Sequence, residues 1–154
     1  MTVRLARPSD VAPAAELWLA LHREHQALDA RYRLAGDAGQ RWAADFREWT
    51  RSRTSAVWLG LDGGRPVGLA TAHLVQTPPT FEPVVLAHVD DLYVTPDRRG
   101  RGLGAALLDA VRQWARDGGA TEVRAGVLAA NPGGRRFWAR EGAGDLSVTV
   151  TMSL

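Results

Sequence analysis

Residues Val84–Ala115 read VVLAHVDDLYVTPDRRGRGLGAALLDAVRQWA, and this stretch decides the fold. A run of apolar and β-branched residues ends at Thr95-Pro96. An arginine- and glycine-rich turn follows, and an apolar pattern with helical spacing comes after the turn. The pattern therefore predicts a strand, a tight turn and a helix in that order.

The turn places Gly100, Gly102 and Gly104 at alternate positions where the helix must begin. Glycine has no side chain, so another molecule can approach the backbone closely at such positions. The first N–H groups of a helix have no internal partner and attract an anion. Positive charge comes in addition from three arginines, Arg98, Arg99 and Arg101. The turn is therefore predicted to bind a pyrophosphate, the alternative being a glycine turn without a ligand.

Two other nucleotide loops do not fit this turn. A P-loop requires a lysine followed by Ser or Thr, and the chain contains no lysine. Gly100, Gly102 and Ala105 satisfy the dinucleotide fingerprint, but that motif requires an acidic residue at the end of the next strand. The next predicted strand instead ends in the apolar residues 127–129.

The segment RGRGLG, from Arg99 to Gly104, has the R/Q-x-x-G-x-G/A pattern. It resembles the acetyl-coenzyme A pyrophosphate loop of the GCN5-related N-acetyltransferases (GNAT), and the preceding LYVTP resembles the strand before that loop. The resemblance in element order covers nearly the whole chain, but the specific motifs are concentrated in residues 84–142.

Composition limits the class of protein. A chain of 154 residues that is 45% hydrophobic is expected to form one domain, here residues 1–154. Because there is no cysteine, disulfides and thiolate nucleophiles are excluded. The chain has no signal peptide pattern and no apolar run of membrane-spanning length, so we expect a cytoplasmic protein that does not bind a membrane. Arginine without lysine suggests a bacterial source with a GC-rich genome.

Charge and histidine spacing argue against two kinds of ligand. The net charge is only +2 and the 19 basic residues are spread among 17 acidic ones, so no nucleic-acid partner is expected. His22 and His25 lie three residues apart on a predicted helix, without a third ligand in the pattern. No metal is therefore expected.

Periodicity predicts the remaining elements. Helices are expected over residues 11–29, 38–51 and 103–117, and a short one is expected after Asn131-Pro132 and up to Gly142. Strands are expected over residues 2–6, 56–61, 66–75, 84–94, 120–128 and 146–154, the second and third forming a hairpin around Gly63-Gly64.

The resemblance implies an α/β (α+β) fold with a mixed, mostly antiparallel sheet of six to seven strands and four helices. In such a fold, strands 84–94 and 120–128 run parallel, and a bulge in strand 84–94 parts the two strands around the cofactor. The cofactor is acetyl-coenzyme A, used as a co-substrate. By resemblance its binding residues are Leu92, Tyr93, Val94, Arg99, Gly100, Arg101, Gly102, Leu103, Gly104, Ala105, Asn131 and Trp138.

The resemblance also implies catalytic roles on the strand before the loop. The Leu92 N–H would stabilise the oxyanion, and the general base would fall two or four residues earlier, which selects Asp90 first and His88 second. Alternation along the strand predicts His88, Asp90 and Leu92 on one face and Asp91 on the other. A purely structural role for the aspartates stays open, with neither acting as a base.

The fourth helix departs from the family pattern. Many members have a tyrosine that protonates the leaving thiolate, and Trp138 stands at that position here. Indole donates a hydrogen bond but is not a usable acid. The thiolate then leaves unprotonated, or water or another residue serves, or catalysis has been lost.

Two functions follow as alternatives. The first is an N-acetyltransferase in which a primary amine of a small molecule or peptide attacks directly in a ternary complex. The second is a non-catalytic acyl-coenzyme A-binding module. A homodimer remains open, and the sequence does not identify the amine.

Overall fold

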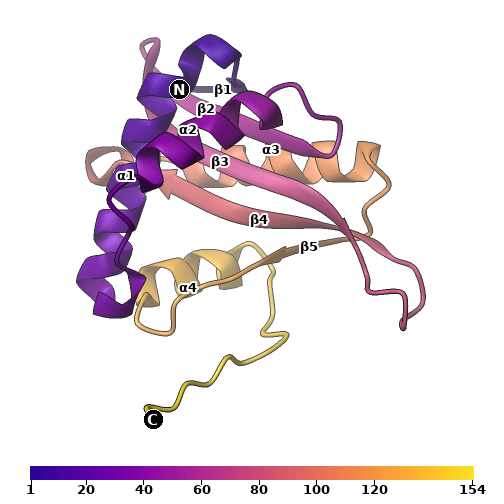
Figure 1. Ribbon diagram of the computed structural model, residues 1–154. Helices are drawn as coiled ribbons and strands as arrows, with labels where there is room; N and C mark the ends of the chain where they lie inside the picture. The colour runs from indigo at the N-terminus through magenta and orange to yellow at the C-terminus, as the bar shows by residue number, and fades with distance from the viewer.

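The structure is a computed structural model that describes residues 1–154. Its sheet and helices are shown in Figure 1. The strands are β1 (Thr2–Leu5), β2 (Ser55–Asp62), β3 (Arg65–Gln76), β4 (Val85–Val94) and β5 (Glu122–Ala125). The helices are α1 (Val11–Leu28), α2 (Ala38–Trp49), α3 (Leu103–Asp117) and α4 (Pro132–Arg140). Single 3₁₀ turns occupy Pro8–Asp10, Ala30–Tyr32 and Pro96–Arg98.

One five-stranded sheet runs in the order β1-β2-β3-β4-β5. Neighbouring strands are antiparallel except for β4 and β5, which are parallel and connected through α3. The turn between β2 and β3 has positive φ angles of 56° at Gly63 and 84° at Gly64, as a two-residue hairpin requires. The predicted hairpin and the predicted parallel pair are both confirmed.

The helices cover both faces of this sheet. One core cluster joins α1 and α2 to the sheet through residues such as Trp18, Phe46 and Leu69. A second cluster lies on the opposite face, where Leu107 and Val111 of α3 are fully buried. Figure 1 shows α1 and α2 on one side of the strands and α3 on the other, with α4 beside β5. The cofactor loop thus connects a central strand to a helix packed on the sheet.

Two glycines set the distance between α3 and the sheet. A Cβ at Gly60 would lie 2.9 Å from Leu103 Cδ1, and a Cβ at Gly68 would lie 3.0 Å from Leu107 Cδ1. Both distances are shorter than ordinary van der Waals contact, so a side chain at either position would require the α3 leucines to shift. The start of α3 is therefore held close to β2 and β3.

The C-terminal strand prediction is wrong. Residues 146–154 form no strand, and the sheet has five strands rather than six to seven. The alternation of apolar and polar residues is present, but alternation makes a strand only where a neighbouring strand accepts its backbone hydrogen bonds. The strand expected over residues 120–128 is also shorter, because β5 pairs with β4 only over Glu122–Ala125. None of the helices is long and apolar enough to span a bilayer.

Candidate active site

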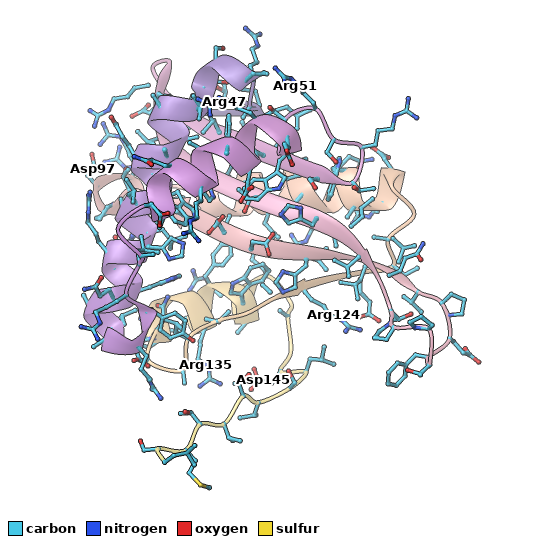
Figure 2. All side chains as sticks on the ribbon, in the orientation of Figure 1. Arg47, Arg51, Asp97, Arg124, Arg135 and Asp145 are labelled. Carbon is cyan, nitrogen blue, oxygen red and sulfur yellow. The ribbon has the colours of Figure 1, made fainter.

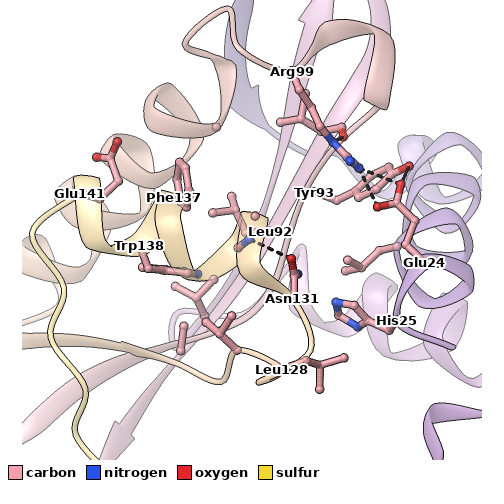
Figure 3. Close-up of a pocket in the computed structure, with 18 of the residues that line it drawn as sticks. Glu24, His25, Leu92, Tyr93, Arg99, Leu128, Asn131, Phe137, Trp138 and Glu141 are labelled. Atoms are coloured by element: carbon pink, nitrogen blue, oxygen red, sulfur yellow. Dashed lines mark hydrogen bonds and ion pairs between the residues drawn. The ribbon is translucent and has the colours of Figure 1, made fainter. Parts of the chain in front are cut away.

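A cavity of about 960 Å³ opens between the end of α1, the strands β4 and β5, the start of α3, and α4. Figure 3 shows the side chains that converge on it from these elements. Most of the residues predicted to bind the cofactor line it: Leu92, Tyr93, Val94, Arg99, Gly100, Gly102, Leu103, Gly104, Ala105, Asn131 and Trp138. Arg101 is the one predicted binding residue that does not. Asp90 also lines the cavity, whereas His88 does not.

A β-bulge at Asp90 creates the gap between β4 and β5. Thr71 pairs with Asp91 and the next residue of β3, Ala72, pairs with Val89, so Asp90 is an extra residue in β4. On the other side, β4 pairs with β5 only as far as Val89 and Ala125. Beyond that point the two strands separate, and the cavity lies between them.

The bulge changes which side chains share a face. Val89 and Leu92 both pack into the α3 cluster, although they are three positions apart and a regular strand would place them on opposite faces, whereas Tyr93 packs into the α1 cluster. His88 pairs across the sheet with His73, whose ring lies 5.0 Å from that of Trp49 in α2. The prediction that His88 and Asp90 share a face with Leu92 is therefore wrong. Both side chains lie on the α1–α2 face, because the extra residue resets the alternation.

The backbone of β4 beyond the bulge offers free groups to the cavity. The Asp91 N–H donates to Thr71 Oγ1 (3.1 Å) and the Thr95 N–H donates to Val67 O (2.9 Å), so both point towards β3. By alternation, the N–H and C=O groups of Leu92 and Val94 point the other way, where β5 no longer pairs with β4. Consistent with this direction, Val94 O accepts a hydrogen bond from Arg99 Nε (2.8 Å).

The loop end of the cavity, residues 98–105, exposes the N-terminus of α3. Gly100 and Gly102 have φ angles of 73° and 83°, which only glycine adopts easily, and a Cβ at either position would meet nothing within 4 Å. Gly102 is the N-cap residue and supplies no side chain to the first N–H groups of the helix. These donors are free for an anion.

Gly104 has a packing role in addition to the predicted one. A Cβ there would lie 3.2 Å from Cε2 of Phe137 in α4. The missing side chain therefore lets α4 pack against the start of α3, and does not only leave room for a ligand.

Two of the three loop arginines already have acidic partners. Arg98 pairs with Asp62 (2.6 Å) and with Asp97 (2.7 Å). Arg99 contacts both carboxylate oxygens of Glu24, at 2.7 and 2.8 Å. Arg101 makes no ion pair.

Glu24 of α1 is a cavity residue that the sequence did not reveal. Its carboxylate bridges Arg99 and the Tyr93 hydroxyl, which donates to Oε1 at 3.1 Å, as Figure 3 shows. The Arg99 guanidinium also lies 5.5 Å from the centroid of the Tyr93 ring. Burial and the Glu24 carboxylate raise the pKa of Tyr93, so its phenol stays protonated. The loop end is thus tied to α1 across the cavity mouth.

The bulge end of the cavity is a chain of polar side chains. Asp90 contacts His73 Nε2 at 2.9 Å and His88 Nδ1 at 3.0 Å, and Ser55 Oγ lies 2.7 Å from His73 Nδ1. Burial acts to raise the pKa of the Asp90 carboxyl, but hydrogen bonds to His73 and His88 and their charges hold that pKa below its ordinary value.

Asp91 has a structural role. Its side chain is buried and accepts a hydrogen bond of 2.6 Å from Thr71 Oγ1, while His22 Nε2 lies 3.7 Å away. This contact joins β3 to β4 at the bulge. His25, three residues beyond His22, lines the cavity, and burial together with its neighbour His22 lowers its pKa, so it is neutral at pH 7. No group of three or more acidic, histidine or cysteine side chains could hold a metal ion.

A match to a protein-family model decides which family the chain belongs to. The model of the Acetyltransferase (GNAT) family matches residues 15–143. The chain belongs to the GNAT acetyltransferase family. Members of this family use acyl-coenzyme A.

The relatives found by sequence are longer than this chain. The uncharacterized N-acetyltransferase MJ1207 of Methanocaldococcus jannaschii is 28% identical over 104 residues, which cover 67% of this chain and 46% of that protein. N-acetyltransferase 8 of Rattus norvegicus is 34% identical over 98 residues, which cover 56% of this chain and 43% of that protein. The chain spans less than half the length of these relatives.

Solved structures of other proteins share the fold. The BH1408 protein from Bacillus halodurans, in a tetramutant form, superposes with a TM-score of 0.87 at 23% identity, and each chain is covered completely. The aminoglycoside N-acetyltransferase AAC(6')-Iy, in complex with CoA, gives a TM-score of 0.80 at 18% identity and covers 99% of this chain and 93% of its own. The predicted GNAT fold is confirmed in its element order and in its parallel β4–β5 pair.

The α4 side of this GNAT cavity follows the sequence prediction. Asn131 caps α4 and its Oδ1 accepts a hydrogen bond from the Gly134 N–H (2.8 Å), with Pro132 at the first helical position. Trp138 packs against the same cluster as Leu92. The centroids of the Phe137 and Trp138 rings lie 5.7 Å apart. Figure 3 shows Trp138 on the side of α4 that faces the strand with Leu92. Its indole is therefore a wall of the cavity.

Proposed function

We propose that this protein transfers an acetyl group from acetyl-coenzyme A to a primary amine by direct attack in a ternary complex. The observation that carries the proposal is the separation of β4 from β5 at the Asp90 bulge. It leaves the backbone groups of Leu92 and Val94 beside a cavity that has the helix N-terminus of α3 at one end and Asp90 at the other.

The chain's own residues fit a coenzyme A molecule. The free N–H groups at the start of α3 match phosphate oxygens, and Gly100 and Gly102 leave space around them. The free β4 groups at Leu92 and Val94 match the amides of a pantetheine arm. When bound, the co-substrate supplies a thioester carbonyl, and the Leu92 N–H is the donor we assign to the oxygen that gains charge during attack.

The proposed reaction forms one bond, breaks one bond and releases one proton. The amine nitrogen forms a bond to the carbonyl carbon, the carbon–sulfur bond breaks, and the amine loses one proton. The departing thiolate is a good leaving group, because thiols have a pKa near ~8.5. Since the chain has no cysteine, no cysteine thiol can carry the acetyl group between the two substrates.

We assign the amine proton to the Asp90–His88 pair. Asp90 lines the cavity and either receives the proton directly or holds His88 through Nδ1, so that the free Nε2 of His88, which lies outside the cavity, receives it by way of a water. His73 cannot serve in the same way, because both of its ring nitrogens already have partners, Ser55 and Asp90. The lowered pKa of Asp90 favours the second arrangement, in which the carboxylate stays ionised.

A second candidate function rests on Trp138. Because an indole stands where many relatives have a tyrosine, the chain could bind acyl-coenzyme A without transferring the acyl group. Both functions require coenzyme A binding, so binding alone does not separate them.

Release of free thiol separates the two functions. The full chain would be incubated with acetyl-coenzyme A and a panel of polyamines, aminoglycosides, amino acids and peptides with free N-termini. Amine-dependent thiol release supports transfer, and its loss in Asp90→Asn, but not in Asp109→Asn on the exposed face of α3, assigns it to this cavity. Coenzyme A binding without thiol release for any amine supports the binding module. Absence of binding would overturn both.

A further inference from the structure

The α1 side of the cavity is the side left for the amine. Coenzyme A is assigned to the start of α3 and to the free backbone groups of Leu92 and Val94. Asp90 and His88, which are assigned to the amine proton, lie on the α1–α2 face of β4, where Asp90 contacts His73 at 2.9 Å. The amine is therefore expected to reach the thioester from the α1 side. The substrate class inferred for this side rests on the proposed function.

Apolar side chains line this side. Leu21 and Leu28 reach the cavity from α1, and Leu128 reaches it from the loop between β5 and α4. Leu28 is 42% exposed, so a ligand that covers its side chain would remove apolar surface from water. In Figure 3, His25 and Leu128 lie at the end of the view away from Arg99. This end of the cavity suits a ligand with an apolar body.

The histidine on this side adds no charge. Burial, together with the neighbouring His22, holds the pKa of His25 below its ordinary value, so its ring is neutral at pH 7. On the other side of Asp90, the ring centroid of Trp49 lies 5.0 Å from that of His73. The surroundings of Asp90 are thus aromatic and apolar apart from the two imidazoles that hold it.

Every carboxylate that lines the cavity already has a partner. Glu24 is bound by Arg99 at 2.7 and 2.8 Å, and Glu141 lies 3.2 Å from Arg112. Asp90 is held by two imidazoles and is the one carboxylate assigned to the reacting amine. A second ammonium group on the same ligand would find no free carboxylate in the cavity.

The one charged lining side chain without an ion pair is a cation. Arg140 of α4 lines the cavity and pairs with no carboxylate. Other charged residues lie on the outside of the molecule, where Figure 2 shows Arg47, Arg51 and Asp97. A second ammonium group would therefore leave water without gaining a counter-ion, and Arg140 would repel it.

We propose that the acceptor is a primary monoamine with an apolar body. Its nitrogen lies beside Asp90, gains the acetyl group and loses one proton, while its apolar body covers Leu28 and Leu128. Polyamines and aminoglycosides are poor acceptors, because each additional ammonium group would be desolvated without a partner.

Two amines with the same hydrocarbon chain test this substrate class. Hexylamine and 1,6-diaminohexane differ only in the second amino group. Thiol release from acetyl-coenzyme A, measured with the full chain, is expected to give hexylamine a kcat/KM at least about tenfold higher. Calorimetry on the protein loaded with coenzyme A is expected to show the same order of affinity, and it does not depend on turnover.

Substitutions at Leu28 provide matched variants. Leu28→Glu places a carboxylate on the apolar side and is expected to lower the ratio of the two kcat/KM values by about tenfold. Leu28→Gln has nearly the same shape as Leu28→Glu without the charge, and should keep the preference for hexylamine. Gln26→Glu adds the same charge to an exposed residue of α1 that does not line the cavity, and should keep the native ratio.

The outcomes separate the substrate class from the transfer itself. Thiol release that is equal or faster with the diamine would overturn the monoamine class and leave the transfer supported. Tighter binding of hexylamine without thiol release would overturn the transfer and leave the ligand class supported. A native ratio in Leu28→Glu would show that the amine does not lie along α1, and binding of neither amine would also overturn the proposal.

Discussion

The loop end of the cavity presents backbone N–H groups at the start of α3, whereas the bulge end presents one carboxylate, Asp90, held by side chains from two strands. At the loop end, glycines contribute by having no side chain, which leaves space beside the backbone N–H groups. At the bulge end, one carboxylate is held by two imidazoles, His73 from β3 and His88 from β4. A backbone site can be encoded in a few consecutive residues, but a side-chain site depends on how the fold brings distant residues together. The predictions below test whether this division corresponds to binding at one end and chemistry at the other.

Asp90→Asn is expected to have the largest effect. The amide keeps the shape of the carboxylate but can neither accept a proton nor hold His88 as an anion, so turnover should fall by about 10²–10⁴-fold. Coenzyme A affinity, measured by calorimetry, should stay unchanged. Asp91→Asn is the matched control, because it changes the neighbouring residue: it should lower thermal stability through Thr71 and leave turnover nearly intact. Equal losses of turnover in both variants would remove the catalytic assignment.

Gly102→Val should weaken coenzyme A binding at the loop end of the cavity. Valine is strained at a φ of 83°, so the loop would shift and the N–H groups of α3 would lose their alignment. Hydrogen bonds to charged groups contribute ~1.5–3 kcal/mol, so coenzyme A affinity should fall about 10- to 100-fold.

Gly104→Val should weaken coenzyme A binding as well, but together with thermal stability, because its side chain would press on Phe137. Calorimetry and thermal melts on both variants would separate a loop effect from a packing effect. An unchanged affinity in folded Gly102→Val would contradict the anion site.

The pH dependence of kcat/KM identifies the group that takes the proton. Because the pKa of Asp90 is held below its ordinary value, its ionised form is favoured in the folded protein and is lost only as pH falls through that lowered pKa. A loss of activity near pH 6 to 7 cannot then be the protonation of Asp90, since an ordinary Asp titrates near ~3.9. His88→Gln is expected to remove most of the turnover, because the His88 Nε2 is the atom assigned to the proton. An unchanged turnover and pH profile in His88→Gln would show that Asp90 accepts the proton without the imidazole.

Glu24→Gln should have a smaller effect of the opposite sign. Glu24 holds Arg99, a residue assigned to the pyrophosphate, and neutralising it frees that guanidinium. Both side chains are more than a third exposed, so the pair contributes at most ~1 kcal/mol. Coenzyme A should bind up to about fivefold more tightly, with no change for Glu16→Gln on the exposed side of the same helix. Weaker binding would show that Glu24 positions Arg99 for the ligand.

Trp138→Phe is expected to have the smallest effect. If the indole is only a wall, phenylalanine should retain most of the turnover, because it keeps an aromatic surface beside Leu92. Trp138→Tyr should introduce a limb at high pH that the native protein lacks, since a phenol titrates near ~10. Collapse of turnover in a folded Trp138→Phe that binds coenzyme A would show that the indole N–H takes part.

The sequence predicted the loop end well, for a physical reason. Strand, turn and helix follow directly along the chain, so Gly100, Gly102 and the start of α3 could be located from spacing alone. Asn131 and Pro132 were found in the same way, because a helix cap is a local pattern. The four helices, the hairpin and the parallel pair also follow from periodicity.

The bulge end could not be read in the same way. A bulge is a property of a strand pair, so neither the extra residue at Asp90 nor its effect on the face of His88 can be seen in one strand. His73 and Glu24 are distant in sequence from Asp90 and Arg99, and no local pattern marks them. Residues 146–154 form no strand although their alternation predicts one, because alternation does not reveal whether a partner strand is within reach.

The bulge also makes the length of β4 a functional property. Deleting Asp90 would let β3 and β4 pair without interruption, and the other side chains would keep their faces, because Val89 and Asp91 already pair with the adjacent residues Ala72 and Thr71. The deletion would therefore leave the core intact, with Tyr93 still in the α1 cluster, and would remove the irregularity at which β4 parts from β5. Insertions in the surface loop between β3 and β4 carry no such penalty, because that loop lies outside the strand pairing. Gaps in alignments with functional relatives should therefore be tolerated in this loop and absent between Val89 and Val94.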